Sequence, residues 1–524
     1  MSTKRAVWIG RWMMVASLMA GSGALAAQEA VNRGPAPSPD ALADSVRELR
    51  EQVRELQRAM AELRSENQQA RAEGTEVRRE MEHLRGPSGP QNAVLVETAA
   101  RSNATVQDEG QQDQKRREHA AKLDEEYELL SGKIDDQYQT KVESASKYRV
   151  RISGIVLMNL FSNSGAVDSI DLPTLAYAKP LAYTRGSFGA TVRQSEVGLE
   201  VFGPRVAGAR MRADLQLDLG GGFVAAPNGA SAGLLRLRTG TMHLDWANTS
   251  VVAGQDGLFF SPNSPTSFAS LAIPALSYAG NLWGWAPQIR VEHRVALDEG
   301  SSIAFQAGVL DPLSGETPNY AIYRQPGAGE ASRQPAFATR IAWTHSLFGQ
   351  PLRVGVAGFF SRQSYGFDRN VDAWAGMTDF ELPLGRQFSL SGKLYRGKGL
   401  GGLYGGLGRS VLFSGDPGSS STLVRGLNTA GGWTQLKYRP VSKLEFNAAF
   451  GLDNPYAVDL RAFPYPQSYG DPGLARNSGG FANVIFRPRS DVLFSAEYRH
   501  LRTYMINSGP DSAEHLNLMM GVLF

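Results

Sequence analysis

Charged side chains occupy every second position in several short segments of this chain. The clearest is 209–219, where Arg210, Arg212, Asp214 and Asp218 alternate with aliphatic residues. Successive side chains of a β-strand point to opposite faces, so a strand here would have one charged and one apolar face. Arginine pairs with carboxylates and phosphates in a bidentate manner. A row of arginines would therefore raise the local concentration of anions.

Other segments extend this charged face beyond one strand. Residues 288–295 and 445–451 repeat the alternation less cleanly. Arginine outnumbers the acids in the full set of candidates for lining a pore, which comprises Arg149, Arg151, Arg193, Arg210, Arg212, Asp214, Asp218, Arg236, Arg238, Arg290, Glu292 and Arg294. Two alternatives stay open for these arginines: ion pairs with Asp and Glu on neighbouring strands, or contacts with lipid phosphates at headgroup level.

No segment supports catalysis or metal binding. The 7 histidines lack the spacing of zinc ligands, and the chain has 0 cysteines. The motif at 229–233 has the Gly-x-Ser-x-Gly pattern of a hydrolase nucleophile, but it lacks the required preceding buried strand and following helix. The glycine-rich run 397–408 resembles a phosphate-binding loop, yet Gly399 stands where that loop needs Ser or Thr, so we expect an external loop. We expect no enzyme, no cofactor and no metal.

The charge balance also excludes one class of partner. With 54 Lys and Arg against 51 Asp and Glu, the net charge is only +3, and no polybasic block occurs. Nucleic-acid binding depends on basic patches that neutralise phosphates. We therefore expect no nucleic acid among the partners.

From Tyr148 onward the pattern predicts an all-β transmembrane barrel over 148–524. Short turn-like breaks lie at 203–208, 247–249, 297–301, 346–351, 383–386, 440–443 and 488–491. Longer stretches rich in Gly, Ser, Pro and Asn lie between them at 163–186, 220–232, 258–281, 312–334, 363–370, 397–427, 453–474 and 504–511. Fifteen alternating connections join about sixteen antiparallel strands, an arrangement typical of bacterial outer-membrane barrels. A barrel of this size leaves an aqueous channel.

One long connection, 258–281, is unusually apolar for a loop in solvent. It contains Phe259, Phe260, Leu271 and Leu276 among other large apolar residues, and such a surface is normally buried. We expect this loop to fold into the barrel and narrow it; packing at a subunit interface is the alternative. The constriction-loop candidates that would face solute are Ser261, Asn263, Ser264, Thr266 and Ser267.

Both ends of the chain indicate export to a membrane. Residues 1–26 combine Lys4 and Arg5 with a short apolar run and small residues, which is the pattern of a signal peptide. The last ten residues carry apolar side chains at every second position and end on the barrel-terminal Phe524, as a closing membrane strand would. Alone, these ten residues also fit a soluble β-sandwich. No other stretch of about 18 apolar residues occurs, so we expect strands to cross the membrane.

Residues 42–84 carry a heptad pattern that predicts an α-helical coiled coil before the barrel. The expected core comprises Leu42, Val46, Leu49, Val53, Leu56, Met60, Leu63 and Asn67. Because such a seam must be buried, we expect a homo-oligomer; Val and Asn at one core position with Leu at the other favour two helices. The alternative is a single amphipathic helix packed on its own protein. A flexible linker, 85–113, and a helical segment, 114–147, complete the expected domains.

The chain resembles the outer-membrane porins that carry an N-terminal coiled coil, and among them the DcaP-like trimeric porins. The resemblance rests on the export signal, the heptads, the segments 148–154 and 193–200, and Phe524. The long linker 85–113 and the dimer-like heptad positions depart from the family pattern.

The resemblance implies a homotrimer in the bacterial outer membrane, with its coiled coil in the periplasm. It also implies passive diffusion of small hydrophilic solutes, often anions. The expected partners are outer-membrane lipid, these solutes, the barrel-insertion machinery and the cell wall. The alternative function is a structural tether, in which the coiled coil is a periplasmic spacer and the barrel only an anchor.

Overall fold

A computed structural model describes residues 141–142, 149–178, 186–222, 233–316, 323–463 and 473–524. The chain divides into two compact units, Met1–Glu109 and Gly110–Phe524, and all described residues belong to the second. The expected signal peptide, coiled coil and linker lie outside the described residues. Within the expected helical segment 114–147, the two described residues form a short strand, β1 (Lys141–Val142), which pairs with β2.

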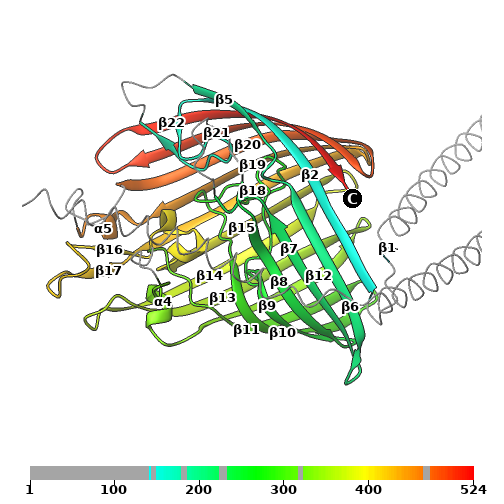
Figure 1. Ribbon diagram of the computed structural model, residues 1–524, viewed down its shortest axis with the longest axis horizontal. Coiled ribbons are helices and arrows are strands. Elements are labelled where there is room, and N and C mark those ends of the chain that lie inside the picture. Colours follow the sequence, from blue (N-terminus) through cyan, green and yellow to red (C-terminus); the bar gives the residue numbers. More distant parts are fainter. Residues whose placement is uncertain (1–140, 143–148, 179–185, 223–232, 317–322, 464–472) are drawn as a thin grey trace, which may run out of the picture. The chain divides into compact units, whose positions relative to one another are not determined.

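Sixteen antiparallel strands form a closed barrel (Figure 1). One of them is interrupted, because β5 (Gly186–Thr191) and β6 (Glu196–Val206) both pair with β2. The others are β2 (Arg149–Ser164), β7 (Ala209–Asp218), β8 (Arg236–Asp245), β9 (Thr249–Gly257), β10 (Trp285–Asp298), β11 (Ser301–Leu310), β12 (Ala336–Leu347), β13 (Gln350–Ser364), β14 (Asn370–Pro383), β15 (Phe388–Lys398), β18 (Asn428–Val441), β19 (Leu444–Pro455), β20 (Leu474–Arg489), β21 (Val492–Met505) and β22 (Pro510–Leu523).

The first and last barrel strands close the sheet. β2 and β22 pair from Ile155 with Leu523 to Ser164 with Glu514, and they lie side by side as the cyan and red strands of Figure 1. Phe524 extends this pairing, because it exchanges two backbone hydrogen bonds with Gly154, at 2.9 and 3.1 Å. Because the barrel is closed, no strand edge is left with unpaired backbone N–H and C=O groups, for which the hydrocarbon core of a membrane offers no hydrogen-bond partner.

The strand residues alternate between a buried inner face and an exposed outer face. On β2, Leu157 and Asn159 are fully buried, whereas Val156 and Leu160 are exposed. The exposed outer positions carry large apolar side chains around the barrel, including Val197, Leu215, Met242, Ile289, Phe305, Ile341, Val356, Trp374, Leu394, Leu436, Phe450, Phe486, Leu516 and Met520. An apolar outer face over a polar inner face is the pattern of a membrane barrel. Among the described residues, no helix is long and apolar enough to cross a membrane.

The connections alternate between short turns and long loops, as the sequence indicated. The short turns join strands that end and begin within a few residues, for example Ser346–Pro351 pairing across the β12–β13 turn. The long connections hold the remaining elements: β3 (Ala166–Val167), β4 (Ala176–Tyr177), α4 (Ala328–Ala331), the 3₁₀ turns η1 (Gly401–Leu403) and η2 (Gly406–Gly408), β16 (Val411–Phe413), β17 (Val424–Gly426) and α5 (Ala457–Leu460).

The connection between β9 and β10, residues 258–284, is buried against the inner face of the barrel, and we call it the inner loop. Phe260 is 1 % exposed and stacks on Phe359 of β13 with ring centroids 5.2 Å apart. At another point Leu276 packs with Trp433 and Phe481. Each such buried side chain contributes about 1.5–3 kcal/mol relative to exposure. The apolar composition therefore holds the loop inside the barrel.

Candidate functional site

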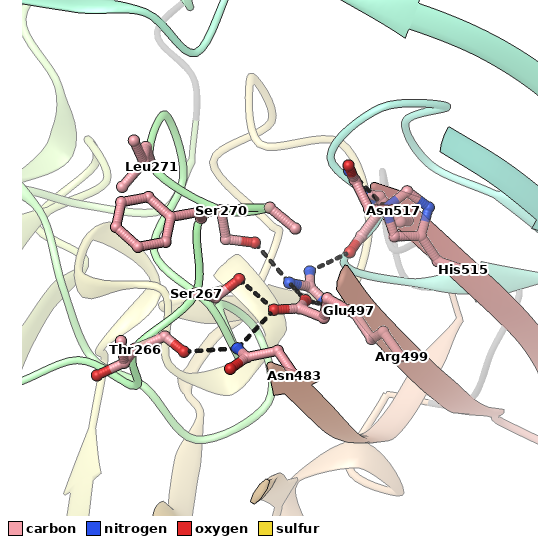
Figure 2. A network of polar contacts seen from close by, with 12 residues as sticks. Thr266, Ser267, Ser270, Leu271, Asn483, Glu497, Arg499, His515 and Asn517 are labelled. Carbon is pink, nitrogen blue, oxygen red and sulfur yellow. Dashed lines mark hydrogen bonds and ion pairs between the residues drawn. The ribbon is translucent and has the colours of Figure 1, made fainter. Parts of the chain in front are cut away.

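A buried polar network fixes the middle of the inner loop to the barrel wall (Figure 2). The Ser267 hydroxyl donates to Glu497 of β21 at 2.5 Å, and Arg499 donates to the Ser270 hydroxyl at 2.6 Å. Glu497 and Arg499 form an ion pair at 2.6 Å, with side chains 0 and 4 % exposed. Asn483 of β20 joins them by donating to the Thr266 carbonyl at 2.9 Å and to Glu497. Buried charges are tolerated where they are paired and hydrogen-bonded in this way.

Lys393 of β15 fixes the two ends of the loop to each other. Its ammonium donates to the Ser261 hydroxyl at 2.6 Å, the Leu282 carbonyl at 3.0 Å, and the Ser261 carbonyl and Asn281 amide oxygen at 3.2 Å. The side chain is 1 % exposed. An ammonium has only three N–H groups, so these four oxygens satisfy it completely and tie residue 261 to residues 281–282.

The backbone of the loop also lies directly on the wall. A Cβ atom added at Gly451 of β19 would lie 2.1 Å from the Ala279 carbonyl oxygen. At Gly280, whose φ is +94°, a Cβ would lie 2.1 Å from the Gly432 carbonyl oxygen. Only glycine permits this approach and this backbone conformation.

The inner loop contributes no charge to the barrel interior. Residues 258–284 contain no Asp, Glu, Lys, Arg or His. Burial, with smaller effects from Tyr404 and Asp168, raises the pKa of Tyr278 well above its usual range, so this phenol stays neutral. Any charge selection beside the loop must therefore come from the barrel wall.

Two cavities border the loop, and we name each by the end of the barrel to which it belongs. The loop-side cavity, about 330 Å³, lies where β9 and β10 meet the long connection and is lined by Gly257, Trp283 and Trp285. The turn-side cavity, about 350 Å³, is lined by Gln350 and Arg386 at short turns. Ser264 of the inner loop lines both cavities.

Each cavity is lined by three cations and one carboxylate. In the loop-side cavity they are Arg238, Arg290 and Arg340, with Asp256. In the turn-side cavity they are Arg386, Lys437 and Arg439, with Glu381. The loop-side arginines are paired with carboxylates of the wall. On the turn side, Lys437 and Arg439 share Glu445, so that cavity keeps an excess of positive charge, which attracts anions in a narrow, low-dielectric space.

Most of the arginines that the sequence suggested as pore-lining form ion pairs, which was one of the two alternatives left open for them. Arg151 contacts Glu200 at 3.2 Å, Arg193 contacts Asp171, Arg212 contacts Asp245 at 3.2 Å, Arg236 contacts Asp218 at 2.6 Å, Arg238 contacts Glu196, and Arg290 contacts Asp256 and Glu292 at 2.7 and 2.6 Å. Asp214 accepts from Thr241 and contacts His243 at 3.1 Å. Within the described part of the chain, Arg149, Arg210 and Arg294 have no carboxylate within 4.0 Å.

The structure divides the loop candidates into two groups. Ser261 and Ser267 are 7 % exposed, and their hydroxyls are bonded to Lys393 and Glu497. Asn263, Ser264 and Thr266 line the turn-side cavity. The first group anchors the loop, although Ser261 also lines the loop-side cavity. Of the second group, Thr266 is bonded to the wall through its backbone as well.

Sequence reasoning missed the buried wall residues that hold the loop, Lys393, Glu497 and Arg499, and also Arg340. Arg340 of β12 pairs with Asp379 of β14 at 2.7 Å, with both side chains almost fully buried. The signal available in the sequence was the alternation along each strand: these charged residues occupy inward positions, and the residues between them are apolar. Glu497 and Arg499 pair within one strand, but the loop residues that they and Lys393 bind lie more than 100 positions away, too far for a local pattern to identify.

The described residues include no group of three or more His, Cys, Asp or Glu side chains placed to hold a metal ion. The glycine-rich run 397–408 begins at the last two residues of β15, and its Leu400 and Leu403 belong to the same buried hydrophobic cluster as Phe260 of the inner loop. These contacts give it a packing role. Of the Gly-x-Ser-x-Gly motif at 229–233, all but the last glycine lies outside the described residues.

The fold is similar to that of solved outer-membrane barrels. The barrel is similar to the outer membrane channel DcaP of Acinetobacter baumannii, with a TM-score of 0.56 and 16 % identity over 73 % of this chain and 99 % of that chain. An anion-selective porin from Comamonas acidovorans matches with a TM-score of 0.43 and 12 % identity over 72 % of this chain and 100 % of that one. No family model matches the chain, and no curated protein matches it in sequence. The resemblance to DcaP-like porins is confirmed for the fold.

Proposed function

We propose that this chain is an outer-membrane porin, a passive diffusion channel for small hydrophilic solutes with a preference for anions. The observation that carries the proposal is the turn-side cavity beside the uncharged inner loop, which is lined by Arg386, Lys437 and Arg439 against Glu381, with Glu445 shared by two of these cations. Selectivity in channels arises from charged side chains at the narrowest part, where binding stays weak enough for release. The proposal includes no catalytic step.

The outer face of the barrel supports the membrane location. Large apolar side chains such as Val156, Ile289 and Leu518 are exposed there, and a soluble protein rarely exposes so continuous an apolar surface. The single-chain barrels of this kind belong to the bacterial outer membrane. We therefore place the barrel in that membrane.

The assembly proposed is a homotrimer whose coiled coil, residues 42–84, lies in the periplasm. The heptads in the sequence and the resemblance to trimeric porins support it. A buried apolar seam requires partner helices, and copies of the same chain are the simplest partners.

Swelling of proteoliposomes tests the channel function. Liposomes containing the purified protein should swell in small sugars and amino acids and not in large polysaccharides, because the cavities admit only small solutes. Liposomes without protein are the control. An absence of swelling from correctly folded protein would support a plugged barrel, and with it the structural tether.

A further inference from the structure

The turn-side cavity lies on the inward-pointing face of its strands. Ser389 and Ser391 of β15 and Lys437 of β18 line it at every second position, in step with the buried Lys393 and Trp433 of the same two strands. The inner loop borders the same cavity. A ligand bound there is therefore a solute of the barrel interior and not a lipid on the outer face.

The positive charge of this cavity is only partly compensated. Lys437 and Arg439 share one carboxylate, Glu445, at 3.3 and 2.5 Å. The carboxylate that lines the cavity, Glu381, already contacts a further cation, Arg353, at 3.6 Å. The carboxylates beside the cavity therefore do not balance its cations.

Arg386 adds a cation that is held in place by its backbone. Its side chain is exposed and has no carboxylate within 4.0 Å among the described residues. The side-chain amide of Gln350 donates to the Arg386 carbonyl at 2.7 Å, and the backbone N–H of Arg439 donates to the Gln387 carbonyl at 2.7 Å. The β14–β15 turn is thereby tied to β13 and β18, so Arg386 stays at the cavity that Lys437 also lines.

The loop-side cavity differs, because its cations already have partners. Its arginine side chains are 6 to 13 % exposed, and each contacts at least one carboxylate: Arg238 contacts Glu196, Arg290 contacts Asp256 and Glu292, and Arg340 contacts Asp379. An anion entering there would have to break a buried ion pair, which leaves a carboxylate without its partner. On the turn side, an anion meets donors that are not yet used.

The unused donors on the turn side fit an oxyanion. A guanidinium has five N–H donors, and in the described part of the chain Arg439 directs only Nη2 to Glu445, while Arg386 makes no side-chain hydrogen bond. Arginine forms two parallel hydrogen bonds to the oxygens of a carboxylate or phosphate. With more than one positive charge available, a dianion gains more than a monoanion.

We propose that the turn-side cavity binds one small divalent oxyanion, such as inorganic phosphate or a dicarboxylate, and that the loop-side cavity binds none. Arg386, Lys437 and Arg439 are the residues that hold the ligand. This inference rests on the proposed function and adds the class of ligand and the place of its site. Because Arg386 and Arg439 are exposed, the ligand stays in contact with water and can leave again, as permeation requires.

Calorimetric titration of the folded full chain in detergent, with inorganic phosphate at low salt, tests the site. We expect one phosphate per chain, and weaker binding of nitrate, an oxyanion with a single charge. Arg386→Gln should weaken phosphate binding about fivefold, because it removes one charge a few ångströms from the ion. Lys437→Gln, on the neighbouring strand, should weaken it to a similar extent.

Arg205→Gln is the matched control. Arg205 is also an exposed arginine near a short turn, between β6 and β7, but it lines neither cavity. This variant loses the same charge and should bind phosphate as the wild type does. An effect as large as that of Arg386→Gln would show that only the overall charge matters and would overturn the site.

The remaining outcomes separate the site from the porin function. Unchanged affinity in both Arg386→Gln and Lys437→Gln would place the phosphate elsewhere and overturn the proposal. A wild type that conducts current but shows no saturable phosphate binding also overturns the site, and leaves the porin function standing. Saturable binding by a folded, inserted wild type that conducts no current would uphold the site and overturn the porin function.

Discussion

Replacing Lys393 by methionine is expected to release the inner loop while the barrel stays folded. The substitution keeps the length of the side chain but removes the donor shared by four buried oxygens. A buried acceptor left without a donor costs about 1–3 kcal/mol. A total loss of about 3 kcal/mol would lower the ratio of docked to released loop about 100-fold. Single-channel recordings should then show higher mean conductance and greater open-channel noise.

Arg396→Met is the matched control for this variant. Arg396 lies three residues along the same strand but on the exposed outer face, so its loss removes a cation without touching the loop. Circular dichroism and heat-resistant migration in gel electrophoresis should show the same folded barrel in both variants as in the wild type. Wild-type conductance and noise in Lys393→Met would show that the other anchors suffice and that Lys393 does not hold the loop.

Arg290→Gln is expected to shift ion selectivity more than the double variant Arg210→Gln with Arg212→Gln. Arg290 lines the loop-side cavity and leaves Asp256 and Glu292 unpaired when it is removed. Arg210 and Arg212 line neither cavity, and charges about 10 Å from the ion are largely screened. We expect the chloride-to-potassium permeability ratio to fall about fivefold for Arg290→Gln and less than about twofold for the double variant.

The zero-current potential in a potassium chloride gradient measures both ratios. The difference between the variants should shrink at high salt, because the Debye length falls to about 3 Å at 1 M. A larger shift in the double variant would place the selective region near the β6–β7 turn, away from the inner loop, and would contradict the site described above.

The positions of the strands and turns were predictable from the sequence because a few neighbouring residues encode each of them. Alternation in segments such as 209–219 identifies the strands, and breaks such as Ala247–Thr249 mark turns that a few residues encode. That the inner loop is buried was also predictable, since Phe259, Phe260 and Leu276 are too apolar for a loop in solvent, but the sequence left both the barrel interior and a subunit interface open as its place. These parts of the fold need no information about distant residues.

The roles of individual polar side chains were not predictable, because their partners are distant in sequence. Ser267 meets Glu497 across 230 positions, and Thr266 meets Gln435 across 169. From the sequence, Ser261 and Ser267 were expected to face solute, whereas in the folded barrel their hydroxyls bond to Lys393 and Glu497 of the wall. The sequence did identify Asp218 and Glu292, the partners of Arg236 and Arg290, but it did not show which charges would meet, so pairing and anion attraction both stayed open.

The measurement that tests the central claim most directly is the current through the wild-type protein in a planar bilayer with a potassium chloride gradient. The account predicts discrete, ohmic conductance steps and a zero-current potential whose sign reports preference for chloride. Conductance steps with a zero-current potential of the opposite sign would contradict the anion preference. The absence of any conductance from folded, inserted protein would contradict the channel itself.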